Sequence, residues 1–345
     1  MNRILIVGPS WVGDMVMSQS LFKALKQNNP DCTIDVLAPA WSLPILARMP
    51  EVNKGLVLPF NHGELKITQR YQLGKKLRAQ YDQAIVLPNS LKSALLPFFA
   101  NIKQRTGWRG EMRYGLLNDV RMLNKEQFPL MVERFVALAY PENATLPENL
   151  PRPQLNTTAE SLQAVQQKYG LNNSLLKEKR KALVICPGAE FGNSKQWPEE
   201  HYAAVANQKI KEGWQVWILG SRNDSKTTEK IFSLIEKPNQ KFCINLASRT
   251  DLVETIDIIA LADAVITNDS GLMHIAAAVN TPLVVVYGST SPQFTPPLND
   301  KVKLIVSDIS CAPCFKRTCR FGHRKCLVDQ LPQNVLNKLE QLLRA

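Results

Sequence analysis

Two kinds of segment alternate along the chain. Short runs that are apolar at nearly every position, such as "ILIV" at residues 4–7, are separated by longer segments with the helical spacing of apolar residues. Strands that are buried on both faces read as continuous apolar runs, so this pattern predicts a parallel α/β sheet. In the first half the predicted strands are 4–7, 34–38, 55–59 and 83–88, with helices at about 15–27, after Pro44, at about 66–80 and at about 132–140.

A proline-rich stretch divides the chain. Residues 141–156 contain four prolines in sixteen positions, which neither continue a helix nor join a sheet. The same alternation then restarts, with strands predicted at 182–188, 215–221, 264–269 and 282–289, and helices at about 158–169, at about 199–212, from near Gly271 and at 331–343. We therefore predict two doubly wound, Rossmann-like domains, 1–150 and 151–330, followed by a C-terminal amphipathic helix at 331–345. The carboxyl ends of both sheets would line a cleft between the domains.

The charge of the chain narrows the choice of partners. With 42 Lys and Arg residues against 30 Asp and Glu in 345 residues, the formal net charge is +12, and the cations concentrate in residues 70–121 and 301–326. Such an excess attracts nucleic acid, an anionic membrane surface or a phosphorylated substrate. The N-terminus lacks signal-peptide organisation, no apolar window is long enough to span a bilayer, and the seven cysteines are an odd number, so we expect a cytoplasmic protein.

The strongest local motif is "TNDSGLMHIAAA" at residues 267–278. An apolar strand ends there, Asp269, Ser270 and Gly271 form a turn, and a helix follows. Free N–H groups at a helix start, beside small residues that permit close approach, favour a diphosphate-sized anion. Asp269 also suits a simple helix cap, and a lone histidine such as His274 is more often structural. In this setting His274 could instead donate to a phosphate or ribose oxygen.

A second motif, "CPGAEFGNSKQWP" at residues 186–198, also follows a strand. Its small residues would bring backbone donors close to a phosphate, and Lys195 would supply a point charge, although any surface lysine could occupy this position. The segment "ILGSRND" at 218–224 adds a third turn to the same edge. The chain has neither a G-x-G-x-x-G fingerprint nor a complete Walker motif, which disfavours a dinucleotide or P-loop enzyme and leaves a nucleotide-sugar binder.

In the first domain, "GPSWVGDM" at residues 8–15 has the glycine spacing of a P-loop. Asp14 stands where a P-loop has lysine, so this loop is not expected to bind a phosphate. Gly8 and Gly13 would instead form a tight strand-to-helix turn that exposes the Asp14 carboxylate.

The segment at residues 101–121 interleaves cations with aromatic residues and glycines. The guanidinium groups belong to Arg105, Arg109 and Arg113, and the aromatic rings belong to Trp108 and Tyr114. Arginine forks suit phosphates and carboxylates, and aromatic rings suit the apolar face of a sugar. Nucleic-acid binding uses the same residue types, and an exposed loop without a partner is the simplest alternative.

Four cysteines near the C-terminal end have the spacing C-x2-C-x4-C-x6-C. They are Cys311, Cys314, Cys319 and Cys326. The first pair has metal-ligand spacing, so a structural zinc site is one interpretation. Free or adventitiously oxidised thiols are the other, because zinc ribbons usually have two distant C-x2-C pairs.

These motifs together resemble the lipopolysaccharide inner-core heptosyltransferases that use ADP-heptose. The resembling segments are "GPSWVGDMVMSQSLFKAL", "APAW", "MPEV", "VLPNSLKSALLPFF", "RTGWRGEMRYGLLNDVR", "CPGAEFG" with "KQWP", and "TNDSGLMHIAAA". The arginine-rich segment and "PSWVGDM" are more similar to the second heptosyltransferase than to the first. The resemblance extends to about residue 300 and does not require the four-cysteine segment.

The resemblance implies a GT-B fold and an inverting transfer of L-glycero-D-manno-heptose from ADP-heptose to the first heptose of heptosyl-Kdo2-lipid A. It implies a protein at the inner face of the cytoplasmic membrane, with no cofactor required for catalysis and no nucleic-acid partner. Carried over, the general base falls on Asp14, the phosphate-contacting lysine on Lys195, the donor-site turn on Asp269, Ser270, Gly271 and His274, and the acceptor contacts on Arg105, Arg109 and Arg113.

Four alternatives stay open at this point. One is a related inner-core heptosyltransferase with a different acceptor, and another is a basic nucleic-acid-binding protein. A third is an NAD(P)-dependent oxidoreductase with a degenerate fingerprint. The fourth is an inactive GT-B relative, which the presence of Asp14 and Lys195 disfavours.

Overall fold

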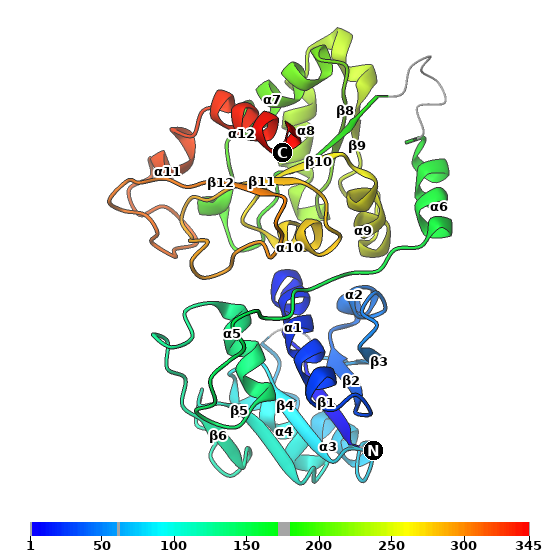
Figure 1. Cartoon of the computed structure of the whole chain (residues 1–345), viewed down its shortest axis with the longest axis vertical. Helices are drawn as coiled ribbons and strands as arrows, with labels where there is room; N and C mark the ends of the chain where they lie inside the picture. The colour runs from blue at the N-terminus through cyan, green and yellow to red at the C-terminus, as the bar shows by residue number, and fades with distance from the viewer. Residues whose placement is uncertain (1, 61–62, 172–179, 345) are drawn as a thin grey trace. The chain divides into compact units, whose positions relative to one another are not determined.

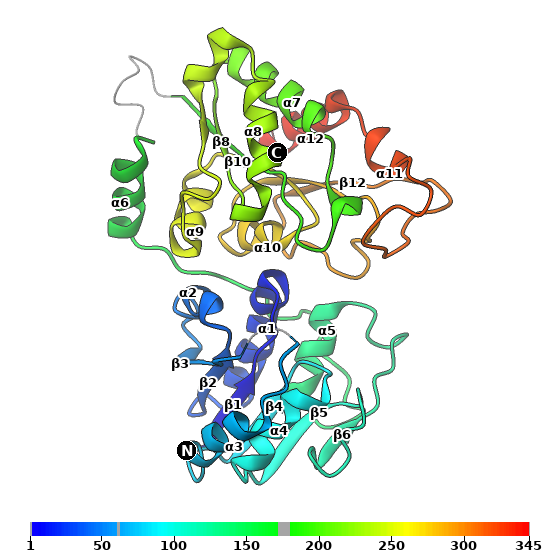
Figure 2. The same ribbon diagram turned by 180° about the vertical axis from the view of Figure 1, so that it is seen from behind.

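The computed structural model describes residues 2–60, 63–171 and 180–344 (Figures 1 and 2). The chain folds as two compact units, Met1–Pro153 and Gln154–Ala345. Each unit contains one six-stranded sheet whose named strands all pair in parallel, with helices on the sheet faces. The predicted fold class of two doubly wound α/β domains is therefore confirmed. Among the described residues, no helix has the length and apolar character needed to cross a membrane.

The first unit has the strand order β3-β2-β1-β4-β5-β6. Its strands are β1 (Arg3–Val7), β2 (Thr33–Ala38), β3 (Val52–Val57), β4 (Gln83–Val86), β5 (Gln104–Trp108) and β6 (Asp119–Arg121). Its helices are α1 (Val12–Asn28), α2 (Leu43–Leu46), α3 (Ile67–Lys76), α4 (Leu91–Phe99) and α5 (Met131–Val136). The order reverses between β1 and β4, which pair directly, and such a reversal opens a crevice at the carboxyl ends of the two strands.

Three elements of the first unit are missed by the apolar pattern. They are α4, β5 and β6, and the last two lie inside the segment 101–121 that read as a basic loop. β5 begins with polar residues and contains Gly107, and β6 has three residues at the edge of the sheet, so neither forms an apolar run. β3 begins three residues before its predicted start, because it is partly exposed and includes the polar residues Asn53 and Lys54.

The second unit repeats this topology, with the order β12-β11-β10-β7-β8-β9. Its strands are β7 (Ala182–Cys186), β8 (Gln215–Ile218), β9 (Cys243–Asn245), β10 (Ala264–Asn268), β11 (Leu283–Val286) and β12 (Val302–Ile305). Its helices are α6 (Ala159–Tyr169), α7 (Glu199–Lys211), α8 (Ser225–Ser233), α9 (Leu252–Leu261), α10 (Gly271–Ala278), α11 (Lys325–Val328) and α12 (Pro332–Arg344). Here the order reverses between the adjacent strands β7 and β10.

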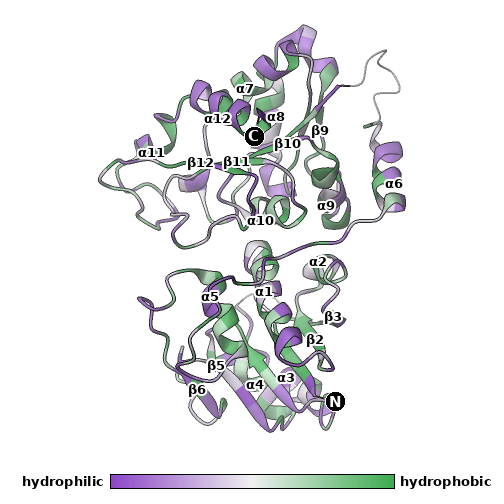
Figure 3. Ribbon diagram, in the orientation of Figure 1, coloured by the Kyte–Doolittle hydropathy of each residue, from purple (hydrophilic) through white to green (hydrophobic). Residues whose placement is uncertain are grey.

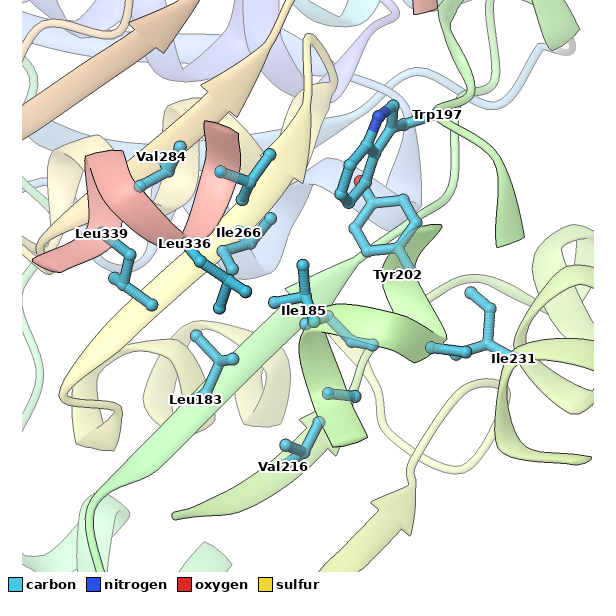
Figure 4. Packing of buried hydrophobic residues seen from close by; sticks show 14 of the residues in the cluster. Leu183, Ile185, Trp197, Tyr202, Val216, Ile231, Ile266, Val284, Leu336 and Leu339 are labelled. Atoms are coloured by element: carbon cyan, nitrogen blue, oxygen red, sulfur yellow. The ribbon is translucent and has the colours of Figure 1, made fainter. Parts of the chain in front are cut away.

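The strands of the second sheet consist mainly of hydrophobic residues (Figure 3), and these residues are buried. On one face, Ile185 and Val284 belong to a buried cluster that also contains Leu336 and Leu339 of α12 (Figure 4). α12 packs against α7, β11 and β12. The amphipathic helix predicted at the end of the chain is therefore part of the core of the second unit.

Removing apolar volume from α12 should destabilise the second unit. Leu339 is fully buried, so the variant Leu339→Ala leaves a cavity and should lower the free energy of unfolding by about 2–5 kcal/mol. Leu331→Ala is the matched control, because Leu331 is 56% exposed just before the helix. The measurement is chemical denaturation followed by far-UV circular dichroism. Equal midpoints for the two variants would show that α12 does not contribute to the core.

Candidate functional site

The loops that follow β7 and β10 meet at the strand-order reversal of the second unit. The loop after β7 contains a short 3-10 turn, Asn193–Lys195, before α7 begins. The loop after β10 is only two residues long and leads directly into α10. Both motifs that predicted anion binding therefore lie at the carboxyl edge of adjacent strands. Open α/β sheets bind their ligands at this position.

An ion pair joins the two loops. The Lys195 Nζ atom lies 2.7 Å from Asp269 Oδ2, and the two side chains are 15% and 4% exposed. The Thr290 hydroxyl, after β11, donates to the same carboxylate oxygen at 2.5 Å. Because Asp269 is held in this way, it fixes the position of the lysine ammonium. An anion that binds Lys195 must share this ammonium with the carboxylate.

Ser270, and not Asp269, is the N-cap residue of α10. Its side chain makes no capping hydrogen bond to the helix, and its hydroxyl pairs instead with Thr267 Oγ1 at 3.3 Å. The interpretation of Asp269 as a simple helix cap is therefore wrong, because its carboxylate binds Lys195. The side chain of Ser270 leaves the first N–H groups of α10 without a capping acceptor, so they can serve an anion.

His274 lies in the first turns of α10 and is 5% exposed. Burial lowers the pKa of its imidazole to about 4; the nearby Asp269 carboxylate opposes this shift and Lys195 adds to it. The imidazole is therefore neutral at pH 7 and carries one N–H donor. It can contribute a hydrogen bond to the site, but not a positive charge.

Asn268, the last residue of β10, was not among the predicted site residues. Its Oδ1 atom accepts hydrogen bonds from the Trp197 amide and the Tyr202 hydroxyl, each at 3.0 Å. Its amide nitrogen donates to the Pro187 carbonyl at 2.6 Å. Asn268 therefore fastens the loop after β7 to the end of β10. The signal in the sequence is a polar residue that ends an apolar strand.

A third loop, between β8 and α8, borders the loop after β7. A Cβ atom at Gly188 would overlap the Asp224 carboxylate, so glycine is needed for this close approach. Asp224 accepts hydrogen bonds from the amide and hydroxyl of Ser221 at 2.8 and 2.7 Å. The Ser221 hydroxyl also lies 3.3 Å from Glu190 Oε1. The segment 218–224 thus adds polar groups to the same edge of the sheet.

Asp14 lies in the first turn of α1, beyond the carboxyl end of β1 in the first unit, and is partly exposed. The expected turn differs in one respect, because Gly13 is already inside the helix. The tight position is Gly8, where a Cβ atom would lie 2.9 Å from Met15 Cε and 3.3 Å from Val36 Cγ1. The close packing of β1 against α1 and β2 therefore favours glycine at position 8.

The three arginines predicted to contact the acceptor have different surroundings. Arg113 is 2% exposed and donates to the Pro88 carbonyl at 2.7 Å and to the Trp108 carbonyl, so its guanidinium is bound within the protein. Arg105 is partly buried and donates to the carbonyls of Leu116 and Ile102. Burial lowers the pKa of both guanidinium groups, which stay charged at neutral pH.

These contacts show a structural role for two of the three arginines, and the acceptor contacts predicted for all three stay a prediction. Arg105 and Arg113 brace the turn between β5 and β6, because both donate hydrogen bonds to backbone carbonyls there. Arg109, at the end of β5, has an exposed side chain. Of the three, it is the residue whose charge is accessible to a substrate.

The four C-terminal cysteines line one small cavity. Cys311, Cys314, Cys319 and Cys326 share it with His323, and all four are free thiols. In the part of the chain that the structure describes, no three side chains are arranged as ligands around one metal ion. The zinc site predicted from their spacing therefore stays a prediction.

The sequence profile of glycosyltransferase family 9 (heptosyltransferase) matches residues 70–325. The chain is similar to lipopolysaccharide heptosyltransferase 2 of Escherichia coli K12, with 49% identity covering 99% of this chain and 98% of that protein. It is equally similar to lipooligosaccharide heptosyltransferase 2 of Haemophilus influenzae Rd, with 49% identity covering 99% of each chain.

Solved structures agree with this relationship. The structure of E. coli ADP-heptose lps heptosyltransferase II superposes with a TM-score of 0.89, at 47% identity, over 100% of this chain and 99% of that one. The E. coli heptosyltransferase WaaC with ADP shares the fold, with a TM-score of 0.69 at 19% identity over 99% of both chains. The protein therefore belongs to glycosyltransferase family 9, the heptosyltransferases.

Proposed function

We propose that this heptosyltransferase transfers L-glycero-D-manno-heptose from ADP-heptose to the first heptose of the lipopolysaccharide inner core, with inversion at the anomeric carbon. The observation that carries the proposal is the pairing of Lys195 with the start of α10 at the strand-order reversal of the second unit. The proposal is supported by the name of the E. coli relative that is 47% identical over its full length, an ADP-heptose lipopolysaccharide heptosyltransferase.

The second unit would bind the donor. The diphosphate of ADP-heptose would accept hydrogen bonds from the amides of Ser270 and Gly271 and an ionic contact from Lys195. Asp269 would keep the lysine ammonium in place, because its carboxylate is fixed by Thr290. When the sugar leaves, negative charge grows on the ADP oxygen, and these cationic and amide donors would stabilise it. Neutral His274 would add one N–H donor without further charge.

The first unit would bind and activate the acceptor. The Asp14 carboxylate would take the proton from the acceptor hydroxyl as its oxygen attacks the anomeric carbon. The bond between that carbon and the ADP oxygen breaks in the same displacement. One glycosidic bond therefore forms, and ADP departs. Arg109 would face the anionic acceptor, with Arg105 and Arg113 holding the turn that carries it. No metal ion enters this mechanism.

The acceptor of this reaction is anchored in a lipid bilayer, so the enzyme would work at the inner face of the cytoplasmic membrane. The net charge of +12 would favour contact with an anionic lipid surface. Nucleic acid is not needed to account for the basic segment, since two of its arginines bind backbone carbonyls.

Replacing the proposed base tests the acceptor half of the mechanism. Asp14→Asn keeps the shape of the side chain but removes its capacity to accept a proton. Turnover should fall by about two orders of magnitude or more, with ADP-heptose affinity nearly unchanged. Heptose transfer is measured by mass spectrometry of the acceptor, and Asp31→Asn, on the exposed surface of the same unit, serves as control. Wild-type turnover in Asp14→Asn would refute the assignment.

Replacing the lysine tests the donor half. Lys195→Ala removes the ammonium from the diphosphate and leaves Asp269 without its cation, so ADP should bind at least about tenfold more weakly in calorimetric titration. Lys211→Ala is the matched control, because Lys211 lies on the exposed surface of the same unit in an ion pair with Glu236. If the two variants bind ADP equally well, Lys195 is not a donor ligand.

A further inference from the structure

A long segment between β12 and α12 has little regular structure. Residues 306–331 contain one helical turn, α11, and otherwise follow an irregular path. Loops of this length inside a compact domain are uncommon unless they have a binding role or a cross-link that orders them. The proposed transfer reaction assigns no task to this segment. Its four cysteines are therefore the natural place to look for what orders it.

The four thiols surround one void. Cys311, Cys314, Cys319 and Cys326 line a cavity of about 20 Å³, together with Ser194 and Ser289 from the neighbouring loops. A void of that size has room for one guest of about the size of a water molecule. A C-x2-C pair with two further cysteines supplies the four sulfurs that a tetrahedral structural zinc site requires.

The electrostatic surroundings favour an anionic cluster of sulfurs. Residues 309–328 contain five Lys or Arg residues and no Asp or Glu. Four thiolates around one Zn²⁺ carry a net charge of −2, which these cations would offset. The same cations would repel a bare metal ion, so the thiolates must supply its binding.

We propose that Cys311, Cys314, Cys319 and Cys326 bind one structural Zn²⁺ ion. Binding releases the protons of the four thiols and forms four zinc–sulfur bonds, with no change in oxidation state. The thiols do not yet converge as ligands of one ion, so their side chains must turn into the cavity that they line. Four free thiols around a shared cavity suit a closed site that keeps no position for a substrate.

The zinc site would also support the loop that carries Lys195. The Ser194 hydroxyl donates to the Lys316 carbonyl, and the Phe315 amide donates to the Ser289 carbonyl at 2.7 Å. Gly192 adopts a φ of +150°, and a Cβ atom there would overlap the Arg317 carbonyl. The cysteine segment therefore lies directly against residues 192–194. Fixing one of these segments with a metal ion restricts the other.

Metal analysis of the intact protein tests this proposal independently of the transfer reaction. The protein is purified under reducing conditions without chelators, incubated with Zn²⁺, desalted and measured by inductively coupled plasma mass spectrometry. We expect about one zinc per chain, released when a mercurial reagent blocks the thiols and detected with a chromogenic chelator. Less than about 0.2 zinc per chain, iron in place of zinc, or a Cys311–Cys314 disulfide under these conditions would overturn the proposal.

Two variants locate the ion. Cys314→Ser should lose the zinc, and Cys243→Ala is the matched control, since Cys243 is a buried thiol of the same unit outside the cavity. Chelation at elevated temperature should lower the melting temperature of the wild type and of Cys243→Ala, but not that of Cys314→Ser. Full zinc content in a folded Cys314→Ser variant would place the metal elsewhere. If Cys314→Ser does not fold, the mercurial release from the wild type still decides the question.

Discussion

The arrangement of the proposed donor site depends on one buried amide side chain, that of Asn268. Asn268 ends β10, yet its hydrogen bonds reach the Pro187 carbonyl at the end of β7 and the Trp197 amide before α7. The strand-order reversal would otherwise leave two loops diverging from neighbouring strands. Losing this side chain would leave buried donors and acceptors unpaired, at about 1–3 kcal/mol for each group. Because Asn268 binds the Trp197 amide, it holds the end of the loop that carries Lys195, and the lysine lies opposite Asp269.

The charges at this edge suit the anion that we propose binds there. A largely buried lysine without a counterion would be costly, and Asp269 removes that cost before any ligand binds. The pair also restricts the lysine to one orientation. His274 beside it is neutral, because burial lowers its pKa to about 4. The site therefore holds one cation, one anion and a row of helix amides, and a bound diphosphate would add the charge that balances the amides.

The fold and the edge of the sheet where the loops after β7 and β10 meet could be predicted from the sequence, because both depend on apolar strands. Strands such as β7 and β10 are buried along their whole length, so their ends, and with them Lys195 and Asp269, could be placed in advance. The ion pair between Asp269 and Lys195 could not be predicted, because the two residues are 74 positions apart and the position of Asp269 also suits a helix cap. Contacts over such distances leave no periodic signal.

The arginine segment shows the same limit. β5 and the edge strand β6 have no apolar runs, so the pattern predicts no strand in this segment and gives no sign of which guanidinium groups are buried. The structure closes a turn there that Arg113 holds from inside. A buried arginine and an exposed one look alike in a sequence, because the difference lies in which carbonyls the fold brings close.

Hydrogen exchange of the intact protein with and without ADP tests the central claim most directly, that the nucleotide binds at the strand-order reversal of the second unit. ADP should slow exchange at the amides of residues 188–195 and 270–273, since the ligand covers both loops. Residues 8–15 of the first unit should exchange at an unchanged rate. Protection confined to residues 8–15, with none at the two loops, would contradict the account.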